Sequence, residues 1–273
     1  MARIIRPRRA RYAYIDRRVK KSRRRLAPIV FFGVVFVLLC GYGITSLGKN
    51  TAVSSSETNS LPSRPQLNKI QLAWPAVGQA AIGSVEDGLL AQSSHTEALR
   101  PTASMAKVIT ALAILERRPL NPGQAGQTYT LTSEDVRDYH AEVSRGGSVV
   151  PVYDGMVLTQ YEAMQAMLIA SGNNIADMLV KVEFGSVEAY AAYAQDMLRR
   201  MELHRTIVAD ASGYSSATVS TPSELVMIGI AALKNPVIAE IVAQPQAQIP
   251  SVGNIKNTNE LLGTDGVIGI KTG

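Results

Sequence analysis

Apolar and polar positions divide the chain into an unbroken apolar stretch, a polar stretch and a long body of short periodic segments. Residues 26–47 carry no charge and are mostly Val, Phe, Leu and Ile. About 20 apolar residues are enough to cross a bilayer, so this stretch predicts a transmembrane anchor. Residues 48–68 are rich in Ser, Thr, Asn and Pro, which is typical of an extended linker. A folded domain is therefore expected over residues 69–273.

Strand-like segments cluster at the two ends of this domain. Near its start, residues 80–85 and 88–92 predict a hairpin with its turn at 86–88. Near its end, residues 249–255 and 266–270 have the composition of short strands. We expect these segments to form one antiparallel sheet that is built from both ends of the domain.

Helices are predicted in the middle of the domain. Apolar residues fall on most faces of the segment 104–117, which predicts a helix buried between layers. Capping-box sequences of the form Thr-x-x-Glu, at 159–162 and 221–224, begin two more helices. Glycines at 146 and 147 and Pro151 indicate a loop-rich region. The predicted helices span 104–117, 159–170, 175–182, 187–201 and 221–233. Helices inserted within a sheet make this an α+β domain.

Charge is distributed unevenly. Residues 1–25 contain 12 Lys and Arg and a single acid, whereas the rest of the chain contains 16 Lys and Arg against 21 Asp and Glu. The body therefore lacks the basic surface that nucleic-acid binding requires. A basic tail before the apolar stretch predicts a cytoplasmic N-terminus and a single-pass anchor with the body on the extracytoplasmic side. A cleaved signal peptide, cut near residues 46–48, remains the alternative.

Cysteine and histidine give no sign of a disulfide or a metal. Cys40 is the only cysteine, so no disulfide forms within the chain. His95, His140 and His204 are scattered without the spacing of metal ligands. We therefore expect neither a metal nor a cofactor.

Three short motifs carry the candidate chemistry. Ser104 and Lys107 are three positions apart on a predicted helix, so both side chains lie on one face, as a nucleophile beside a base. Ser-x-x-Lys also occurs at 46–49, but there it lies at the membrane edge without partner motifs. Ser-Gly-Asn at 171–173 falls between two predicted helices, and Lys-Thr-Gly at 271–273 follows a predicted strand. A set of this kind is found in penicillin-binding proteins and class A β-lactamases, with Ser-Asp-Asn in the middle.

The domain resembles the D-alanyl-D-alanine carboxypeptidases, which are low-molecular-mass penicillin-binding proteins of the S11 serine peptidase family. The resemblance covers about residues 73–273 and rests on segments 100–107, 170–174, 210–213 and 269–273. It implies a β-lactamase/transpeptidase-like fold. The segment Asp-Ala-Ser-Gly at 210–213 belongs to the resemblance, but we expect it to be structural.

The resemblance implies a reaction and its catalytic residues. Ser104 would attack the carbonyl of the penultimate D-alanine of a peptidoglycan stem peptide, an acyl-enzyme would form, and water would hydrolyse it after the terminal D-alanine leaves. Ser171 corresponds to a proton shuttle, and Asn173 to a residue that binds both Lys107 and the substrate amide. Lys107 must be neutral to act as the base, and burial together with the charge of Lys271 is expected to lower its pKa.

The resemblance also implies how the substrate and its inhibitors bind. Lys271 and Thr272 would bind the terminal carboxylate, a charge-assisted contact. Gly273 would let the substrate backbone lie against the strand edge. β-Lactams mimic the end of the stem peptide, so acylation of Ser104 by penicillin is expected.

One departure from the family concerns the end of the sequence. In the family the strand after Lys-Thr-Gly continues, further strands and a C-terminal helix follow, and the residue after the glycine supplies the second oxyanion donor. Loss of one such donor costs on the order of a hundredfold or more in rate. We therefore expect a fragment or truncated product without the C-terminal strands and helix. Residues 69–273 alone are expected not to be labelled stoichiometrically by a fluorescent penicillin.

Two other functions share these motifs. A β-lactamase needs a second base, typically from a Glu-x-x-Leu-Asn loop, and the nearest segment, at 260–263, does not match it. A non-catalytic, membrane-tethered protein that binds peptidoglycan remains the alternative from a different class. Ser104→Ala distinguishes them, because it abolishes a carboxypeptidase and leaves a binding protein intact.

Overall fold

Helix α2 (Ala106–Arg117) is the helix against which most of the others pack. In this computed structural model, which describes residues 72–94 and 96–273, α2 contacts α4, α5, α6 and α7. Nine of its twelve residues are buried, so the predicted burial is confirmed. The predicted tail (1–25), anchor (26–47) and linker (48–68) lie outside the described residues, as does His95.

The helices follow the capping and apolar signals of the sequence closely. All five predicted helices are present; the first begins with a 3-10 turn, Ala103–Met105, and continues as α2. The others are α4 (Gln160–Leu168), α5 (Asn173–Phe184), α6 (Val187–Arg200) and α7 (Pro222–Lys234). The predicted capping boxes both start helices, since the side chains of Thr159 and Thr221 accept hydrogen bonds from the backbone of Glu162 and Glu224.

Two further helices were not predicted. Helix α3 (Ser133–Ser144) lies between the predicted helices 104–117 and 159–170 and ends just before the glycines at 146 and 147 that indicated a loop-rich region. It has few apolar residues and only one buried residue, so the apolar periodicity that reveals the other helices is missing. Helix α8 (Pro236–Val242) follows α7 directly, and Asn235 caps it by accepting from two backbone N–H groups.

The α+β class is confirmed, but within residues 72–94 and 96–273 the single sheet expected from both ends of the domain is not formed. The strands pair as four two-stranded antiparallel sheets: β1 with β2, β3 with β6, β4 with β5, and β7 with β8. Their bounds are β1 (Ala81–Ser84), β2 (Gly88–Gln92), β3 (Arg100–Pro101), β4 (Thr128–Thr130), β5 (Val157–Thr159), β6 (Val219–Ser220), β7 (Gln246–Ile249) and β8 (Gly253–Lys256).

The two C-terminal strand predictions are wrong in detail. Residues 249–255 were predicted as one strand, but they contain the turn between β7 and β8, and Pro250 has no N–H for a ladder. Residues 266–270 are not a strand, because no ladder joins them to another segment in the part of the chain that is described. The hairpin β1–β2 packs against α7 instead. Strand composition alone does not supply the neighbour that a strand needs.

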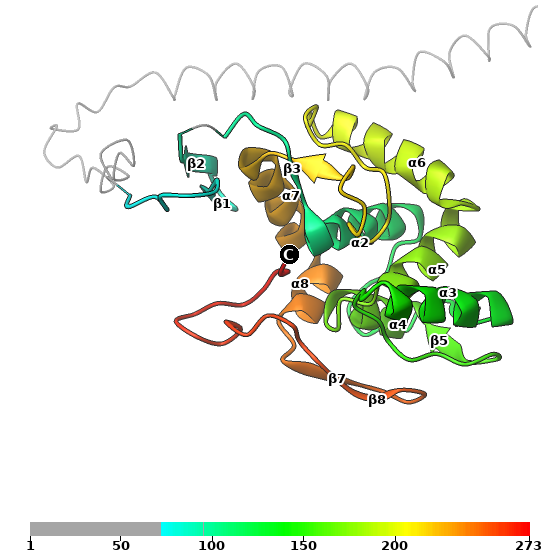
Figure 1. Cartoon of the computed structure of the whole chain (residues 1–273). Coiled ribbons are helices and arrows are strands. Elements are labelled where there is room, and N and C mark those ends of the chain that lie inside the picture. Colours follow the sequence, from blue (N-terminus) through cyan, green and yellow to red (C-terminus); the bar gives the residue numbers. More distant parts are fainter. Residues whose placement is uncertain (1–71, 95) are drawn as a thin grey trace, which may run out of the picture. The chain divides into compact units, whose positions relative to one another are not determined.

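The chain beyond β8 brings the third motif back to the start of α2. In Figure 1 this segment, drawn in red, runs from the hairpin β7–β8 to the middle of the domain. A Cβ atom added to Gly273 would lie 3.5 Å from Cβ of Ala103 and 3.6 Å from the carbonyl oxygen of Thr102. Gly273 therefore lies beside the residues that immediately precede Ser104.

Apolar side chains from α2, α4, α5, α6 and α8 form one buried cluster. No single helix among residues 72–94 and 96–273 is long and apolar enough to cross a bilayer. Helices α7 and α8 together pass that test, but the chain bends by 102° between them.

Candidate active site

Ser104 and Lys107 meet at the start of α2. Ser104 lies in the 3-10 turn and Lys107 in the first turn of the helix, and Nζ of Lys107 donates to Oγ of Ser104 over 2.9 Å. Ala103, just before the serine, has a φ of 46°, which non-glycine residues rarely adopt. Such backbone strain is concentrated at functional sites, where the surrounding structure holds it in place.

Three oxygen atoms surround the amine of Lys107. Besides Oγ of Ser104, Nζ contacts Oδ1 of Asn173 at 2.7 Å and the carbonyl oxygen of Ser212 at 2.9 Å. The carbonyl and carboxamide oxygens are acceptors only, so each holds one N–H of the lysine. When Lys107 is neutral, its lone pair therefore faces Ser104. The geometry suits removal of a proton from the serine hydroxyl.

The pKa of Lys107 is lowered to about 7, which confirms the predicted direction. Burial is the largest cause, and the positive charge of Lys271 is the next. The carboxylates of Asp177, Asp210 and Glu142 act in the opposite direction. At neutral pH a substantial part of the protein therefore holds Lys107 as a free amine.

Ser171 and Asn173 lie where α4 gives way to α5. Oγ of Ser171 donates to Oγ of Ser104 over 2.9 Å, and Asn173 is the first residue of α5. Ser171 has a φ of 61°, so the chain turns sharply there. Gly172 is packed tightly, because an added Cβ would lie 3.1 Å from Cγ2 of Val150. This turn places the Ser171 hydroxyl against Ser104 and the Asn173 carboxamide against Lys107.

The Lys-Thr-Gly segment lies beside this group without hydrogen bonds to it. Nζ of Lys271 contacts the carbonyl oxygen of Thr272 at 3.0 Å, and the hydroxyls of Thr258 and Thr272 at 3.4 Å. Among the described residues, no hydrogen bond joins it to Ser104, Lys107, Ser171 or Asn173. Burial lowers the pKa of Lys271 to about 8. Lys271 interacts with the other motifs electrostatically, because its positive charge lowers the pKa of Lys107.

The sequence profile of the D-alanyl-D-alanine carboxypeptidases matches residues 80–273. The chain belongs to this family. D-alanyl-D-alanine carboxypeptidase DacB2 of Mycobacterium tuberculosis is 31% identical over 202 residues, which cover 70% of this chain and 64% of that protein. The chain thus spans a little under two thirds of the length of this relative.

Solved structures of related proteins have a similar fold. A D-alanyl-D-alanine carboxypeptidase from Mycobacterium tuberculosis matches with a TM-score of 0.61 at 27% identity, covering 71% of this chain and 72% of that one. The Streptomyces K15 DD-transpeptidase matches with a TM-score of 0.62 at 23% identity, covering 72% and 79%. At that identity the second likeness shows the fold alone. The expected penicillin-binding fold is thereby confirmed.

The segment 210–213 is closer to the chemistry than the sequence indicated. The carbonyl of Ser212 contacts Lys107, as described above, and Asp210 accepts hydrogen bonds from Ser212, Ser215 and Thr218, which hold the loop. Gly213 has a φ of 73°, and an added Cβ would lie 1.8 Å from the carbonyl oxygen of Ala103. The segment is structural, as expected, but it also places an acceptor on the candidate base of this carboxypeptidase-family domain.

Two acids near the site, the buried Glu142 and the half-buried Asp177, were not predicted. Glu142, on α3, accepts a hydrogen bond from Nδ2 of Asn173 over 3.0 Å. Asp177, on α5, has a pKa raised to about 7, mainly by burial and then by the charges of Glu142 and Asp210. Neither lies in a family motif. Helix α3 itself was not predicted, so no sequence pattern pointed to Glu142.

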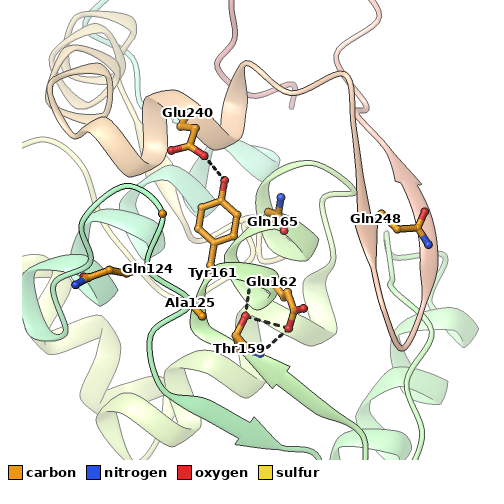
Figure 2. Close-up of a pocket in the computed structure, with 9 residues that line it drawn as sticks. Gln124, Ala125, Thr159, Tyr161, Glu162, Gln165, Glu240 and Gln248 are labelled. Atoms are coloured by element: carbon orange, nitrogen blue, oxygen red, sulfur yellow. Dashed lines mark hydrogen bonds between the residues drawn. The ribbon is translucent and has the colours of Figure 1, made fainter.

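A hollow in the surface is lined by residues other than these. It has a volume of about 410 Å³ and is lined by Gly123, Gln124, Ala125, Thr159, Tyr161, Glu162, Gln165, Glu240 and Gln248. Figure 2 shows Tyr161 pointing from α4 toward Glu240, to which its hydroxyl donates over 2.7 Å. None of the candidate catalytic or substrate-binding residues of the carboxypeptidase motifs lines it.

Proposed function

We propose that this protein is a serine-type D-Ala-D-Ala carboxypeptidase that removes the terminal D-alanine from peptidoglycan stem peptides. One observation carries the proposal. Lys107 is buried with two N–H groups held by Asn173 and Ser212 and its third position directed at Ser104. A serine hydroxyl needs a base to become a nucleophile, and this arrangement supplies one without a histidine.

In the proposed first half of the reaction, Lys107 takes the proton of Ser104 as the serine oxygen bonds to the carbonyl carbon of the penultimate D-alanine. The C–N bond to the terminal D-alanine then breaks. The leaving amine must gain a proton, and Ser171, 2.9 Å from Ser104, is placed to pass it on. In the second half, water adds to the ester, its proton goes to the same base, and Ser104 leaves with a proton restored.

Lys271 and Thr272 are proposed to bind the terminal carboxylate of the substrate. A carboxylate beside a lysine forms a charge-assisted hydrogen bond, and the partly buried position of Lys271 strengthens the attraction. Gly273, beside Ala103, leaves room for the substrate backbone. β-Lactams, which mimic this end of the substrate, are proposed to acylate Ser104.

The proposed location is the bacterial cytoplasmic membrane. The basic tail at 1–25 and the apolar stretch at 26–47 support a single-pass anchor, with the domain from residue 69 on the extracytoplasmic side, where peptidoglycan is found. Protease accessibility of this domain in spheroplasts tests the orientation. Protection of the domain in intact spheroplasts would contradict it.

Labelling by a fluorescent penicillin and release of D-alanine from a stem pentapeptide test the reaction. The protein is expressed from its complete reading frame, and Ser104→Ala is compared with the wild type. Ser46→Ala is the matched control, since Ser46 stands in the other Ser-x-x-Lys sequence. We expect Ser104→Ala to abolish both activities and Ser46→Ala to leave them unchanged. Binding of the pentapeptide without acylation or D-alanine release would favour a non-catalytic binding protein.

A further inference from the structure

Glu142 is a buried carboxylate that is linked to the candidate base, Lys107, through the side chain of Asn173. It is in the last turn of α3 and is only 2% exposed. Its Oε2 accepts from Nδ2 of Asn173 over 3.0 Å, and its Oε1 is paired with Arg145. The proposed reaction gives it no role, yet burying a carboxylate is costly unless hydrogen bonds compensate it.

The two ends of the Asn173 carboxamide face opposite partners. A carboxylate only accepts hydrogen bonds, so Glu142 binds the NH₂ end of Asn173 and rejects the oxygen end. The oxygen is thereby directed at Lys107, 2.7 Å away. A carboxamide turned by 180° would place its oxygen against the carboxylate and its donors against the lysine.

We infer that Glu142 is a positioning residue that fixes the orientation of the Asn173 carboxamide and so keeps an acceptor on Lys107. The inference rests on the proposed function for its effect on rate, but the orientation itself is independent of it. Without Glu142, one of the two acceptors that hold the lysine N–H groups is free to turn away. The lone pair of the neutral lysine is then no longer directed at Ser104.

The surroundings of Glu142 keep this contact closed. A Cβ atom added to Gly147 would lie 2.3 Å from Oε2 of Glu142 and 2.9 Å from Nδ2 of Asn173, so the backbone covers the pair. On the outer side, the guanidinium of Arg145 lies over the ring of Tyr214, and the Tyr214 hydroxyl donates to the carbonyl of Arg145 over 2.8 Å. The end of α3 is thus tied to the segment that follows Ser212, the other acceptor of Lys107.

A pair of variants separates orientation from charge. In Glu142→Gln the side chain keeps one oxygen, and the charged Arg145 takes it, because a charge-assisted hydrogen bond is the stronger one. The amide nitrogen then faces Asn173 and reverses its carboxamide. In the double variant Glu142→Gln with Arg145→Met, the glutamine oxygen is free for Asn173, so the orientation returns while the negative charge stays absent.

Two measurements are made on the full-length protein: the rate of acylation by fluorescent penicillin, and the NMR signal of the Asn173 side-chain NH₂ group. We expect Glu142→Gln to slow acylation about tenfold or more and to shift the Asn173 signal. Arg145→Met alone stays near wild type, and the double variant recovers most of the loss in both measurements. Thermal unfolding confirms that each variant is folded.

Several results would overturn the inference. One is a folded Glu142→Gln protein with wild-type acylation and an unchanged Asn173 signal. Another is a double variant in which the effects of the two substitutions merely add. If the wild type is not acylated, the proposed function fails and the Asn173 signal alone decides: no shift in Glu142→Gln removes the positioning role. If Glu142→Gln does not fold, a folded double variant with a shifted Asn173 signal has the same consequence.

Discussion

Nζ of Lys107 lies 2.9 Å from the carbonyl oxygen of Ser212, which is 105 residues further along the chain. This contact explains why a lysine in an apolar helix is tolerated, since a buried amine needs partners for its hydrogen atoms. With Asn173 as the second acceptor, it leaves Ser104 opposite the third position of the amine. The predictions below follow from this arrangement and from the charges around it.

Acylation by penicillin is expected to depend on pH with a midpoint near 7. The pKa of Lys107 is about 7, and only its neutral form accepts the proton of Ser104, so the rate rises as pH increases through this value. Lys107→Arg stays protonated at all these pH values and is expected to lower the rate by about a hundredfold or more. The second-order acylation rate is measured from about pH 5 to pH 9. A flat profile over this range would show that Lys107 is not the base.

Lys271→Met is expected to move the same profile to higher pH. The charge of Lys271 lowers the pKa of Lys107, so its removal lets that pKa rise. The variant also loses the contact with the substrate carboxylate, and KM for the stem peptide should increase about tenfold or more. Lys271→Arg retains the charge and is the control for the pH profile. An unchanged midpoint in Lys271→Met would contradict the coupling between the two lysines.

The stability of the wild type relative to Lys107→Met is expected to increase with pH between about 7 and 10. The folded state holds Lys107 with a pKa of about 7, whereas in the unfolded chain it returns to 10.5. Between these values the unfolded state binds the extra proton, so raising the pH favours folding of the wild type. Urea unfolding of both proteins at several pH values measures the difference. A constant difference would mean that the pKa of Lys107 is the same in both states.

Gly213→Ala is expected to destabilise the domain by several kcal/mol and to abolish labelling. The added Cβ would lie 1.8 Å from the carbonyl oxygen of Ala103, and the backbone has a φ of 73°. Gly253→Ala is the matched control, because Gly253 has a φ of 92° with open space around its Cβ position. It should cost about 1 kcal/mol and leave labelling intact. Equal effects of the two substitutions on unfolding would show that the contact with Ala103 is unimportant.

The sequence predicted best those elements that are determined by local signals, such as helix-capping residues and apolar periodicity. Apolar periodicity and capping boxes predicted α2, α4 and α7 because these helices bury one or more faces and begin with a threonine or a serine-containing turn. Helix α3 was not predicted because it is polar almost throughout. The prediction of a strand at 266–270 was wrong for a different reason: whether a segment forms a strand depends on a pairing partner that is distant in the sequence.

The candidate site was predicted only as far as its side chains belong to motifs. The structure brings Ser104, Lys107, Ser171 and Asn173 into one hydrogen-bonded group. The contact between Lys107 and the carbonyl of Ser212 could not be predicted, because every residue has a carbonyl and only the fold determines which one contacts Lys107. The contact of Glu142 with Asn173 was not predicted, because a single glutamate in a polar helix is usually exposed to solvent.

The hydrogen bonds of Lys107 also make acylation a reporter of folding. Its two fixed acceptors, Asn173 and Ser212, are 66 and 105 residues away in the chain. Contacts of such long range close large loops, and the entropic cost of loop closure makes them slow to form. In an incompletely folded chain Lys107 is hydrated and protonated, and Ser104 has no base. Time-resolved labelling with a fluorescent penicillin during refolding would therefore record the closure of these long loops.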